Sequence, residues 1–250
     1  MLQWIRSLVF FAGMLLTALV YSPFAILVSP FPPVTRSRLI GWWAKMTVAW
    51  LRVTCGLSHR VKGIENLPAA PCVILSKHQS AWETIAFQEI FPPQAWVLKR
   101  ELLWVPFFGW GLAATRPIAI DRSAGVRALE DVVKQGIDRL AGGRYVVVFP
   151  EGTRMPPGKR GRYNPGGAML AKKAGVPVVP VAHNSGSYWS RRGFLKRPGV
   201  IEVRVGPPVD VQDKRPKLIN AEAEAWIEAQ MVGLEPGLHK ATGHASANRG

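Results

Sequence analysis

Apolar and polar positions divide the chain into two stretches with different patterns. In the first stretch, residues 7–35 contain no charged side chain at all. The run from Leu2 to Tyr21 has about the 20 residues that a helix needs to span a bilayer. Prolines then predict a break, because proline removes a helical hydrogen bond; they stand at positions 23, 30, 32 and 33. A second helix is expected from Arg36 to Cys55.

The second predicted helix is amphipathic. Basic residues interrupt it, and tryptophans, which are enriched at lipid headgroups, lie among them: Arg36, Arg38, Lys45, Arg52, Trp42, Trp43 and Trp50. Residues 1–56 are therefore expected to form a helical hairpin that lies in one leaflet, with Arg6 on the side of these basic residues. A single spanning helix is one alternative. A cleaved secretory signal is another, although no clear cleavage site follows the apolar run.

From residue 57 onward, short apolar runs alternate with helical patterns. The runs are rich in β-branched residues and bounded by Gly, Pro or charged residues, as buried strands are; they cover 71–77, 94–99, 116–120, 144–149, 177–182 and 200–205. Helices are predicted from a cap at Ser123 to Gly142, over 166–175 and over 220–234. The alternation predicts an α/β domain over residues 57–234, with a mostly parallel sheet flanked by helices. Residues 235–250 are expected to form a disordered tail.

Composition and charge narrow the class of protein. The chain has 32 Lys and Arg against 16 Asp and Glu, a net charge of +16, while 48% of its residues are apolar. This apolar fraction excludes a disordered chain, and two cysteines exclude a disulfide-rich scaffold. The cysteines lack the spacing of zinc ligands, so no metal site is expected. The basic residues alternate with strand-end motifs instead of forming one cluster, so no nucleic-acid partner is expected.

A histidine and a glutamate after the first predicted strand of this domain form a candidate catalytic pair. A carboxylate can hold one imidazole nitrogen protonated and leave the other free to accept a proton. His78 and Glu83 would lie about 140° apart on one helix, so they pair only if His78 precedes the helix and Glu83 lies in its first turn. The segment SAWE, residues 80–83, has the pattern of a capping box, which supports that geometry. Alone, the same pattern also fits a purely structural role for Glu83.

The loop FPEGTR, which follows the predicted strand 144–149, is a candidate anion site. Gly152 permits a tight turn, Thr153 offers a hydroxyl, and Arg154 has a planar guanidinium group that suits phosphate. Lys99 ends the predicted strand 94–99, and Arg122 follows the predicted strand 116–120. Both are expected to lie beside Arg154, because ligands gather at the carboxyl ends of parallel strands. For all of these residues an ordinary turn with a solvated basic surface is the alternative.

Four segments occur in the order of the four motifs of the glycerolipid acyltransferases: KHQSAWE, AIDR, VFPEGTR and VPVVPVA. Over residues 60–210 the chain resembles the bacterial 1-acyl-sn-glycerol-3-phosphate acyltransferases, and the N-terminal hairpin is in keeping with that family. The resemblance implies transfer of a fatty acyl group from acyl-CoA or an acyl-carrier protein to the free sn-2 hydroxyl of lysophosphatidic acid, which gives phosphatidic acid. It implies no cofactor beyond this thioester co-substrate. Membrane lipids are the further partner, and the cytoplasmic face of the inner membrane is the expected location.

The resemblance also implies roles for single residues. His78 is the general base and Glu83 orients it, although the family usually has Asp at that position. The residues that the resemblance assigns to the substrates are Arg122, Glu151, Gly152, Thr153, Arg154 and, in an apolar stretch, Pro180. No serine nucleophile is required, because a thioester is already activated, and the chain has no GxSxG motif.

Three alternatives to this function remain. The first is the same chemistry on another acceptor, such as glycerol 3-phosphate, another lysophospholipid or a lyso-aminolipid, because a fold and its motifs do not fix the substrate. The second is a basic membrane-binding protein without catalytic activity. The third is an inactive relative that binds lipids, against which the presence of both His78 and Glu83 argues.

Overall fold

A seven-stranded sheet forms the centre of the molecule, in the order β1-β7-β6-β2-β5-β3-β4. The computed structural model describes residues 1–106, 108–121 and 124–238. The strands are β1 (Leu57–Lys62), β2 (Val73–Ser76), β3 (Gln94–Lys99), β4 (Ile118–Ile120), β5 (Tyr145–Val148), β6 (Val178–His183) and β7 (Gly199–Val205). Neighbouring strands are parallel except for β6 and β7. The predicted α/β fold with a mostly parallel sheet is confirmed.

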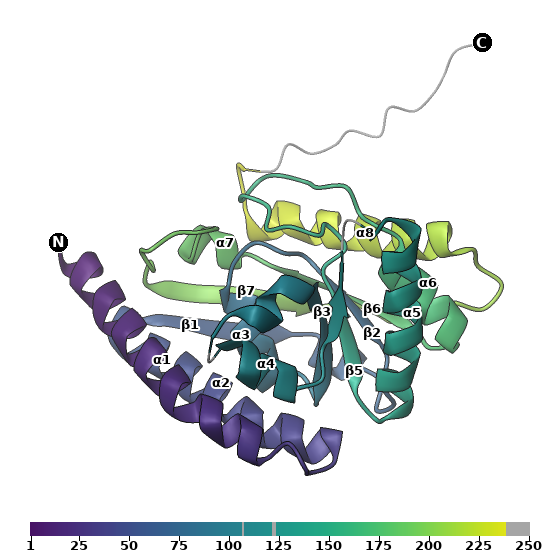
Figure 1. The fold of residues 1–250 in the computed structure, drawn as a ribbon. Helices are drawn as coiled ribbons and strands as arrows, with labels where there is room; N and C mark the ends of the chain where they lie inside the picture. The colour runs from purple at the N-terminus through teal and green to yellow at the C-terminus, as the bar shows by residue number, and fades with distance from the viewer. Residues whose placement is uncertain (107, 122–123, 239–250) are drawn as a thin grey trace.

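Helices cover both faces of the sheet (Figure 1). On one side lie α1 (Leu2–Leu27), α2 (Pro33–Cys55), α3 (Trp82–Ile90), α4 (Phe108–Ala114) and the 3-10 turn η2 (Arg100–Trp104). On the other side lie α5 (Val126–Ala141), α6 (Gly166–Ala174) and α8 (Pro216–Leu234). The 3-10 turn η1 (Ile64–Asn66) and the short helix α7 (Ser185–Tyr188) complete the described elements. In β2, Ile74 packs toward the first side, while Val73 and Leu75 pack toward the second.

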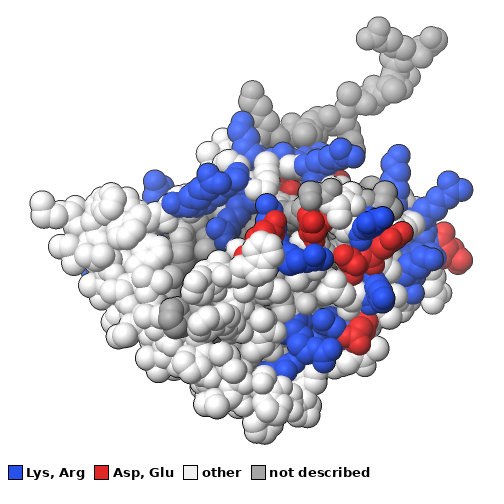
Figure 2. Space-filling view, viewed as in Figure 1, with Lys and Arg blue, Asp and Glu red and all other residues white. Residues whose placement is uncertain are grey.

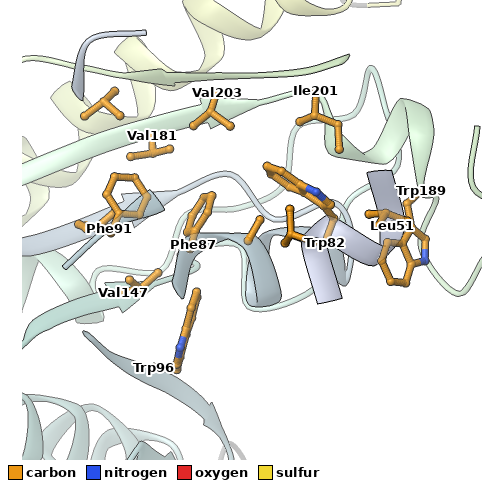
Figure 3. Close-up of a cluster of buried hydrophobic side chains, with 14 of the residues drawn as sticks. Leu51, Trp82, Phe87, Phe91, Trp96, Val147, Val181, Trp189, Ile201 and Val203 are labelled. Carbon is orange, nitrogen blue, oxygen red and sulfur yellow. The ribbon is translucent and has the colours of Figure 1, made fainter. Parts of the chain in front are cut away.

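Aromatic side chains fill the larger hydrophobic cluster, which lies between the sheet and helices α1 to α3. Trp82, Phe87 and Trp96 lie there beside apolar residues of the central strands (Figure 3). The rings of Phe87 and Trp96 stack with their centroids 6.2 Å apart. Burial of a side chain such as Phe87 stabilises the fold by roughly 1.5–3 kcal/mol. This packing fixes the strands whose ends carry the candidate site.

The N-terminal helices form the predicted hairpin, but α1 is longer than expected. It continues through Pro23, where a break is predicted, and ends at Leu27. Beyond Pro23, Ala25 is buried in a small cluster with α2 and α4, made of Ala25, Val28, Ile40 and Ala114. This burial holds the helix together past the proline. Among the described residues, α1 is the one helix long and apolar enough to cross a membrane, by length and composition alone.

The hairpin packs closely against the rest of the molecule. The backbone N–H of Lys196 donates to Ser7 Oγ at 3.0 Å, and Trp4 stacks on Phe194 with centroids 5.0 Å apart. Phe10 also belongs to the large cluster beneath the sheet. The packing therefore crosses the boundary that composition places at residue 56. The outer side of α1 exposes large apolar side chains, and this part of the surface is white in Figure 2, with almost no charged residue.

Two local features differ from the sequence prediction. β1 is not predicted, because most of its residues are polar. Glu235 belongs to the predicted disordered tail, yet it is only 3% exposed. It is buried because its carboxylate accepts hydrogen bonds from Gln79 Nε2 and from the Gly158 N–H, both at 2.8 Å. The predicted cap Ser123 and residues 239–250 of the predicted tail lie outside the described residues.

Candidate active site

The carboxyl ends of the parallel strands meet at one edge of the sheet, and the candidate residues lie along it. His78 follows β2, the loop 149–154 follows the neighbouring β5, and Lys99 ends β3. In the register of β3 and β4, Lys99 lies beside Ile120, the last residue of β4. Arg122 comes two positions later and lies outside the described residues. The strand order therefore places the described candidates in a row, as expected for such an edge.

His78 and Glu83 are in direct contact. The His78 Nδ1 atom and the Glu83 Oε1 atom are 2.8 Å apart. α3 begins at Trp82, so His78 precedes the helix and Glu83 lies in its first turn, which is the geometry that the spacing requires. The Glu83 side chain is fully buried, while that of His78 is 14% exposed. With Nδ1–H donating to the carboxylate, the Nε2 atom of His78 is left to accept a proton.

The Glu83 carboxylate also accepts backbone hydrogen bonds at the start of α3. Its Oε1 atom accepts the backbone N–H groups of Gln79 and Ser80, each at 2.7 Å. The Ser80 Oγ atom accepts the N–H of Trp82 at 3.1 Å, one residue earlier than in a standard capping box. The structural and the chemical interpretations of Glu83 are therefore compatible, because the contacts that start the helix also hold the acid against the imidazole.

The second oxygen of Glu83 is held by a residue that the sequence analysis does not identify. Ser185 Oγ donates to Glu83 Oε2 at 2.9 Å. Burial raises the pKa of Glu83, but His183, His78 and the N–H of Ser80 outweigh it and lower the pKa to about 2. Glu83 is therefore ionised at neutral pH, as a partner for a protonated imidazole must be.

His183, at the end of β6, is a second buried histidine that the sequence analysis misses. Its Nε2 atom donates to the Lys77 carbonyl at 2.8 Å, and burial lowers its pKa. One signal in the sequence could have identified His183 and Ser185. They lie at and just after the end of an apolar strand, and polar residues at such strand ends often belong to a site. No motif marks them, and only the strand order shows that β6 lies beside β2.

Lys77 lies at the centre of a buried ionic network. Its Nζ atom donates to Glu151 Oε1 at 2.7 Å, to Glu228 Oε1 at 2.9 Å and to the Lys159 carbonyl at 3.0 Å. These three contacts use all the donors of an ammonium group. The Glu151 side chain is fully buried, and its Oε2 atom accepts the backbone N–H of His78 at 3.1 Å. The network therefore ties the end of β2 to the loop after β5 and to α8.

The loop after β5 lies directly against His78. The Phe149 ring stacks on the imidazole with centroids 4.0 Å apart, and the Met155 N–H donates to the His78 carbonyl at 2.7 Å. Gly152 has a φ of 67°, in the left-handed region where glycine is favoured, which lets the chain turn here. Arg154 is half-buried. Its guanidinium therefore extends from backbone that is fixed to the candidate base.

Not every predicted residue lies at this site. Lys99 and Thr153 are exposed at the strand edge. Pro180 is buried inside β6, beside Leu75 of β2. Its neighbours Val179 and Val181 pack into the cluster on the α3 side, so Pro180 faces the α8 side. The structure therefore does not bring Pro180 to His78, which stacks on Phe149 on the α3 side.

A cavity of about 540 Å³ lies beside the ionic network of Lys77. It lies between the start of α1, the loop after β5 and the segment around α7, and its lining includes Trp4, Pro157, Gly186, Tyr188, Phe194 and Leu238. The N–H of Gly186 donates to Gln79 Oε1 at 3.1 Å, which connects the lining to the backbone after His78. Among the described residues no group of three or more His, Cys, Asp or Glu side chains could hold a metal ion.

Comparisons with known proteins place the chain in a family. The family model described as Acyltransferase matches residues 58–184. A Pseudomonas aeruginosa protein named 1-acyl-sn-glycerol-3-phosphate acyltransferase is 44% identical over 94% of this chain and 93% of its own length. A Saccharomyces cerevisiae protein of the same name is 30% identical over 77% of this chain and 66% of its own length.

The fold has a solved counterpart. The crystal structure of the 1-acyl-sn-glycerophosphate acyltransferase PlsC from Thermotoga maritima superposes with a TM-score of 0.77. The match covers 93% of this chain and 95% of that chain, at 22% sequence identity, so it concerns the fold alone. The resemblance predicted from the four motifs is confirmed by the family model and by the relatives, and the chain belongs to the acyltransferase family.

Proposed function

We propose that the protein is a 1-acyl-sn-glycerol-3-phosphate acyltransferase, which moves a fatty acyl group from a thioester to the sn-2 hydroxyl of lysophosphatidic acid. The relatives that are 44% and 30% identical carry that name. One observation carries the proposal. His78 Nδ1 lies 2.8 Å from the buried Glu83 carboxylate, while the backbone next to Arg154 is bonded to the His78 carbonyl. The residue that we propose as the base and the one that we propose as the phosphate ligand therefore lie in adjoining segments.

The proposed reaction needs no covalent acyl-enzyme. His78 Nε2 takes the proton of the acceptor hydroxyl while that oxygen attacks the thioester carbonyl. The new C–O bond forms, the C–S bond breaks, and the imidazolium returns the proton to the departing thiolate. The ionised Glu83 carboxylate stabilises the imidazolium, as the buried acid does in other acid–histidine pairs. General-base assistance of this kind contributes roughly 10²–10⁴-fold to the rate.

Phosphate binding positions the acceptor hydroxyl. We assign the acceptor phosphate to Arg154, with Gly152, Thr153 and Lys99 at the same strand edge. We also assign it to Arg122, which lies outside the described residues, on the resemblance alone. The planar guanidinium of arginine suits two phosphate oxygens at once. Holding the hydroxyl near the base reduces the entropic cost of the reaction.

Two of the predicted substrate residues receive other roles in this proposal. The Glu151 carboxylate is buried on Lys77 and on the His78 N–H. We assign Glu151 a positioning role, in which it holds the backbone of the base. Pro180 has a packing role on the α8 side of the sheet. It lies there with Trp226 so close to Gly206 that a side chain added at Gly206 would collide with both.

The hairpin gives the enzyme access to lipids from one leaflet. α1 packs against α2, α4 and the segment that carries Phe194 instead of extending away from the domain. Its outward side is apolar, as expected for a helix that lies in the membrane interface. We place the protein at the cytoplasmic face of the inner membrane, where the lipid chains of acceptor and product stay in the bilayer. The net positive charge attracts anionic acceptors and donors.

An activity screen tests this function. The purified full-length chain, in vesicles, is offered lysophosphatidic acid, glycerol 3-phosphate, another lysophospholipid and a lyso-aminolipid, each with acyl-CoA and with acyl-carrier protein as the donor. Products are identified by mass spectrometry. We expect phosphatidic acid as the fastest product with at least one donor. Faster turnover of another acceptor, or no product with either donor, would overturn the substrate assignment.

A further inference from the structure

A second group of basic residues lies at the opposite edge of the sheet from His78. Arg116 precedes β4, Arg144 precedes β5, Arg139 lies in the last turn of α5, and Arg36 lies in the first turns of α2. Figure 2 shows basic side chains at this end of α5, next to the white surface of the hairpin. The proposed reaction uses none of these arginines.

Arg36 is buried, and some of its N–H donors have no hydrogen-bond partner among the described residues. It is 6% exposed, and its Nη1 atom donates to the Ser29 carbonyl at 2.7 Å, in the turn between α1 and α2. Its Nε and Nη2 atoms are buried and have no hydrogen-bond partner among the described residues. The neighbouring hydroxyl of Ser37 also lacks one. Buried N–H groups of a charged side chain are costly to leave unpaired, so they indicate a ligand.

Arg144 repeats this arrangement from the other side of the group. It is 2% exposed, and its Nη1 atom donates to the Thr115 carbonyl at 2.7 Å, while its Nε atom has no partner in the described part of the chain. Arg139 Nε donates to the next carbonyl, that of Arg116, at 2.9 Å. Two guanidinium groups therefore gather around one short stretch of backbone.

The charges of this group are not balanced by the carboxylates described. The acid that lies near is Asp138, and it pairs with Arg139. Neither Arg36 nor Arg144 forms an ion pair with a described acid. Burial lowers the pKa of Arg144 to about 10, and Arg139, Arg116 and Arg36 act in the same direction. Burial and two of these neighbours lower the pKa of Arg36 as well. An anion bound here would relieve this repulsion.

We propose that Arg36 and Arg144, with Arg116 and Arg139 beside them, bind the phosphate group of an anionic membrane phospholipid at the bend of the hairpin. Guanidinium groups bind phosphate oxygens with two parallel hydrogen bonds. A lipid fits better than free phosphate, because the turn around Ser29 also exposes Leu27 at 75% and Phe31 at 50%. These side chains can lie along the acyl chains while the arginines hold the headgroup.

A thermal titration tests this site. The melting temperature of the full-length chain in neutral detergent is followed while phosphatidylglycerol is added, and in a separate arm while inorganic phosphate is added. A ligand that binds only the folded state raises the melting temperature once its concentration approaches the dissociation constant, and the rise continues with the logarithm of the ligand concentration. We expect a rise with phosphatidylglycerol that begins at low concentration, and a much weaker one with inorganic phosphate at equal concentration.

Variants locate the effect. Arg36→Gln and Arg144→Gln should each lower the apparent affinity for phosphatidylglycerol by at least about tenfold, because each removes a charged hydrogen-bond donor group. Arg38→Gln is the matched control, since this exposed arginine lies two residues along the same helix and carries the same charge. Arg154→Gln should keep the response, which separates this site from the catalytic one.

Clear results would overturn the proposal. An unchanged phosphatidylglycerol response in Arg36→Gln and Arg144→Gln would remove the site. An equal response of the wild-type chain to inorganic phosphate would assign the arginines to a free anion and not to a lipid. If the Gln variants do not fold, Arg36→Lys serves instead, because it keeps the charge and removes the Nε and Nη2 donors. Arg36→Lys should weaken lipid binding and leave acyl transfer to detergent-dispersed acceptor unchanged.

Discussion

The two edges of the sheet hold buried cations in opposite ways. At the carboxyl edge, the Lys77 ammonium donates to two carboxylates and one carbonyl, and all of its donors are used. At the amino edge, Arg36 and Arg144 each donate to backbone carbonyls and keep buried N–H groups without a described partner. Lys77, whose hydrogen-bond donors all have partners, fixes a loop. Arg36 and Arg144, which keep donors without partners, can bind an anion. The partners of a buried basic residue, more than its burial, therefore indicate its role.

The same distinction applies within the candidate active site. Lys77 and Arg154 both lie near His78, but Arg154 is half-buried and forms no ion pair with an acid in the described part of the chain. Lys77 therefore supports the site, and Arg154 remains available to a substrate. Removal of the positive charge at Lys77 should therefore lower the stability of the fold, whereas the same removal at Arg154 should weaken substrate binding.

The largest effect is expected from breaking the saturated network. Lys77→Met leaves Glu151 buried without its cation, so it should lower the free energy of unfolding by about 3–5 kcal/mol. Urea denaturation measures the change. Lys159→Met is the control, because its side chain is exposed, and it should stay within about 0.5 kcal/mol of wild type. Equal stability of wild type and Lys77→Met would show that the network does not hold the fold.

Glu83 should make stability depend on pH in acid. Its pKa is lowered from 4.5 to about 2 in the folded chain, so its contribution is present above about pH 4.5 and is lost as the pH falls toward 2. This contribution is about 3 kcal/mol. Unfolding measured from pH 7 to pH 2 should show a weaker acid dependence in Glu83→Gln than in wild type.

Glu83 variants also separate charge from helix capping. Glu83→Gln should lose more turnover than Glu83→Asp, because only a charged group stabilises the imidazolium of His78. Steady-state rates of both variants give the comparison. If Glu83→Gln turned over as fast as wild type, Glu83 would be only a helix cap.

Arg154→Gln should damage binding with little effect on stability. Loss of a charged hydrogen bond to phosphate raises the KM for the acceptor by roughly 10–100-fold. The KM for the acyl donor should change much less. Arg162→Gln, an exposed arginine further along the same loop, is the matched control. Equal acceptor KM values for Arg154→Gln and Arg162→Gln would remove Arg154 from the phosphate site.

The smallest effect is expected from Ser185. Ser185→Ala removes one hydrogen bond to Glu83 Oε2, but the other contacts of that carboxylate remain. The cost should be about 1 kcal/mol, which lowers the melting temperature by about 2–4 °C in a chain of this size. Calorimetry tests this against Ser190→Ala, at an exposed serine. Identical melting temperatures of the two variants would contradict a role of Ser185 in holding the acid.

Local patterns predict the elements whose burial is uniform. The apolar runs around β2, β5 and β6 are strands because both of their faces are covered by helices. β1 is missed because most of its side chains are polar and it pairs only at the sheet edge. Pro23 does not end α1, because burial of Ala25 in a tertiary cluster outweighs the local cost of the proline.

Candidate residues are found where one short segment contains the whole arrangement. His78 and Glu83 can be paired from spacing and a capping pattern alone. Lys77 and Ser185 cannot, because their partners come from distant parts of the chain. Arg36 illustrates the limit: an amphipathic pattern predicts a basic residue at the membrane surface, yet the side chain is buried under the hairpin turn.

The turnover of His78→Ala tests the central claim most directly. Phosphatidic acid formed from lysophosphatidic acid and the preferred acyl thioester is measured for wild type and His78→Ala, side by side in vesicles. The account predicts that turnover falls by roughly 10²–10⁴-fold, with melting temperature and vesicle binding unchanged. A variant that keeps most of the wild-type rate would contradict the account, because another group would then have to take the proton of the acceptor.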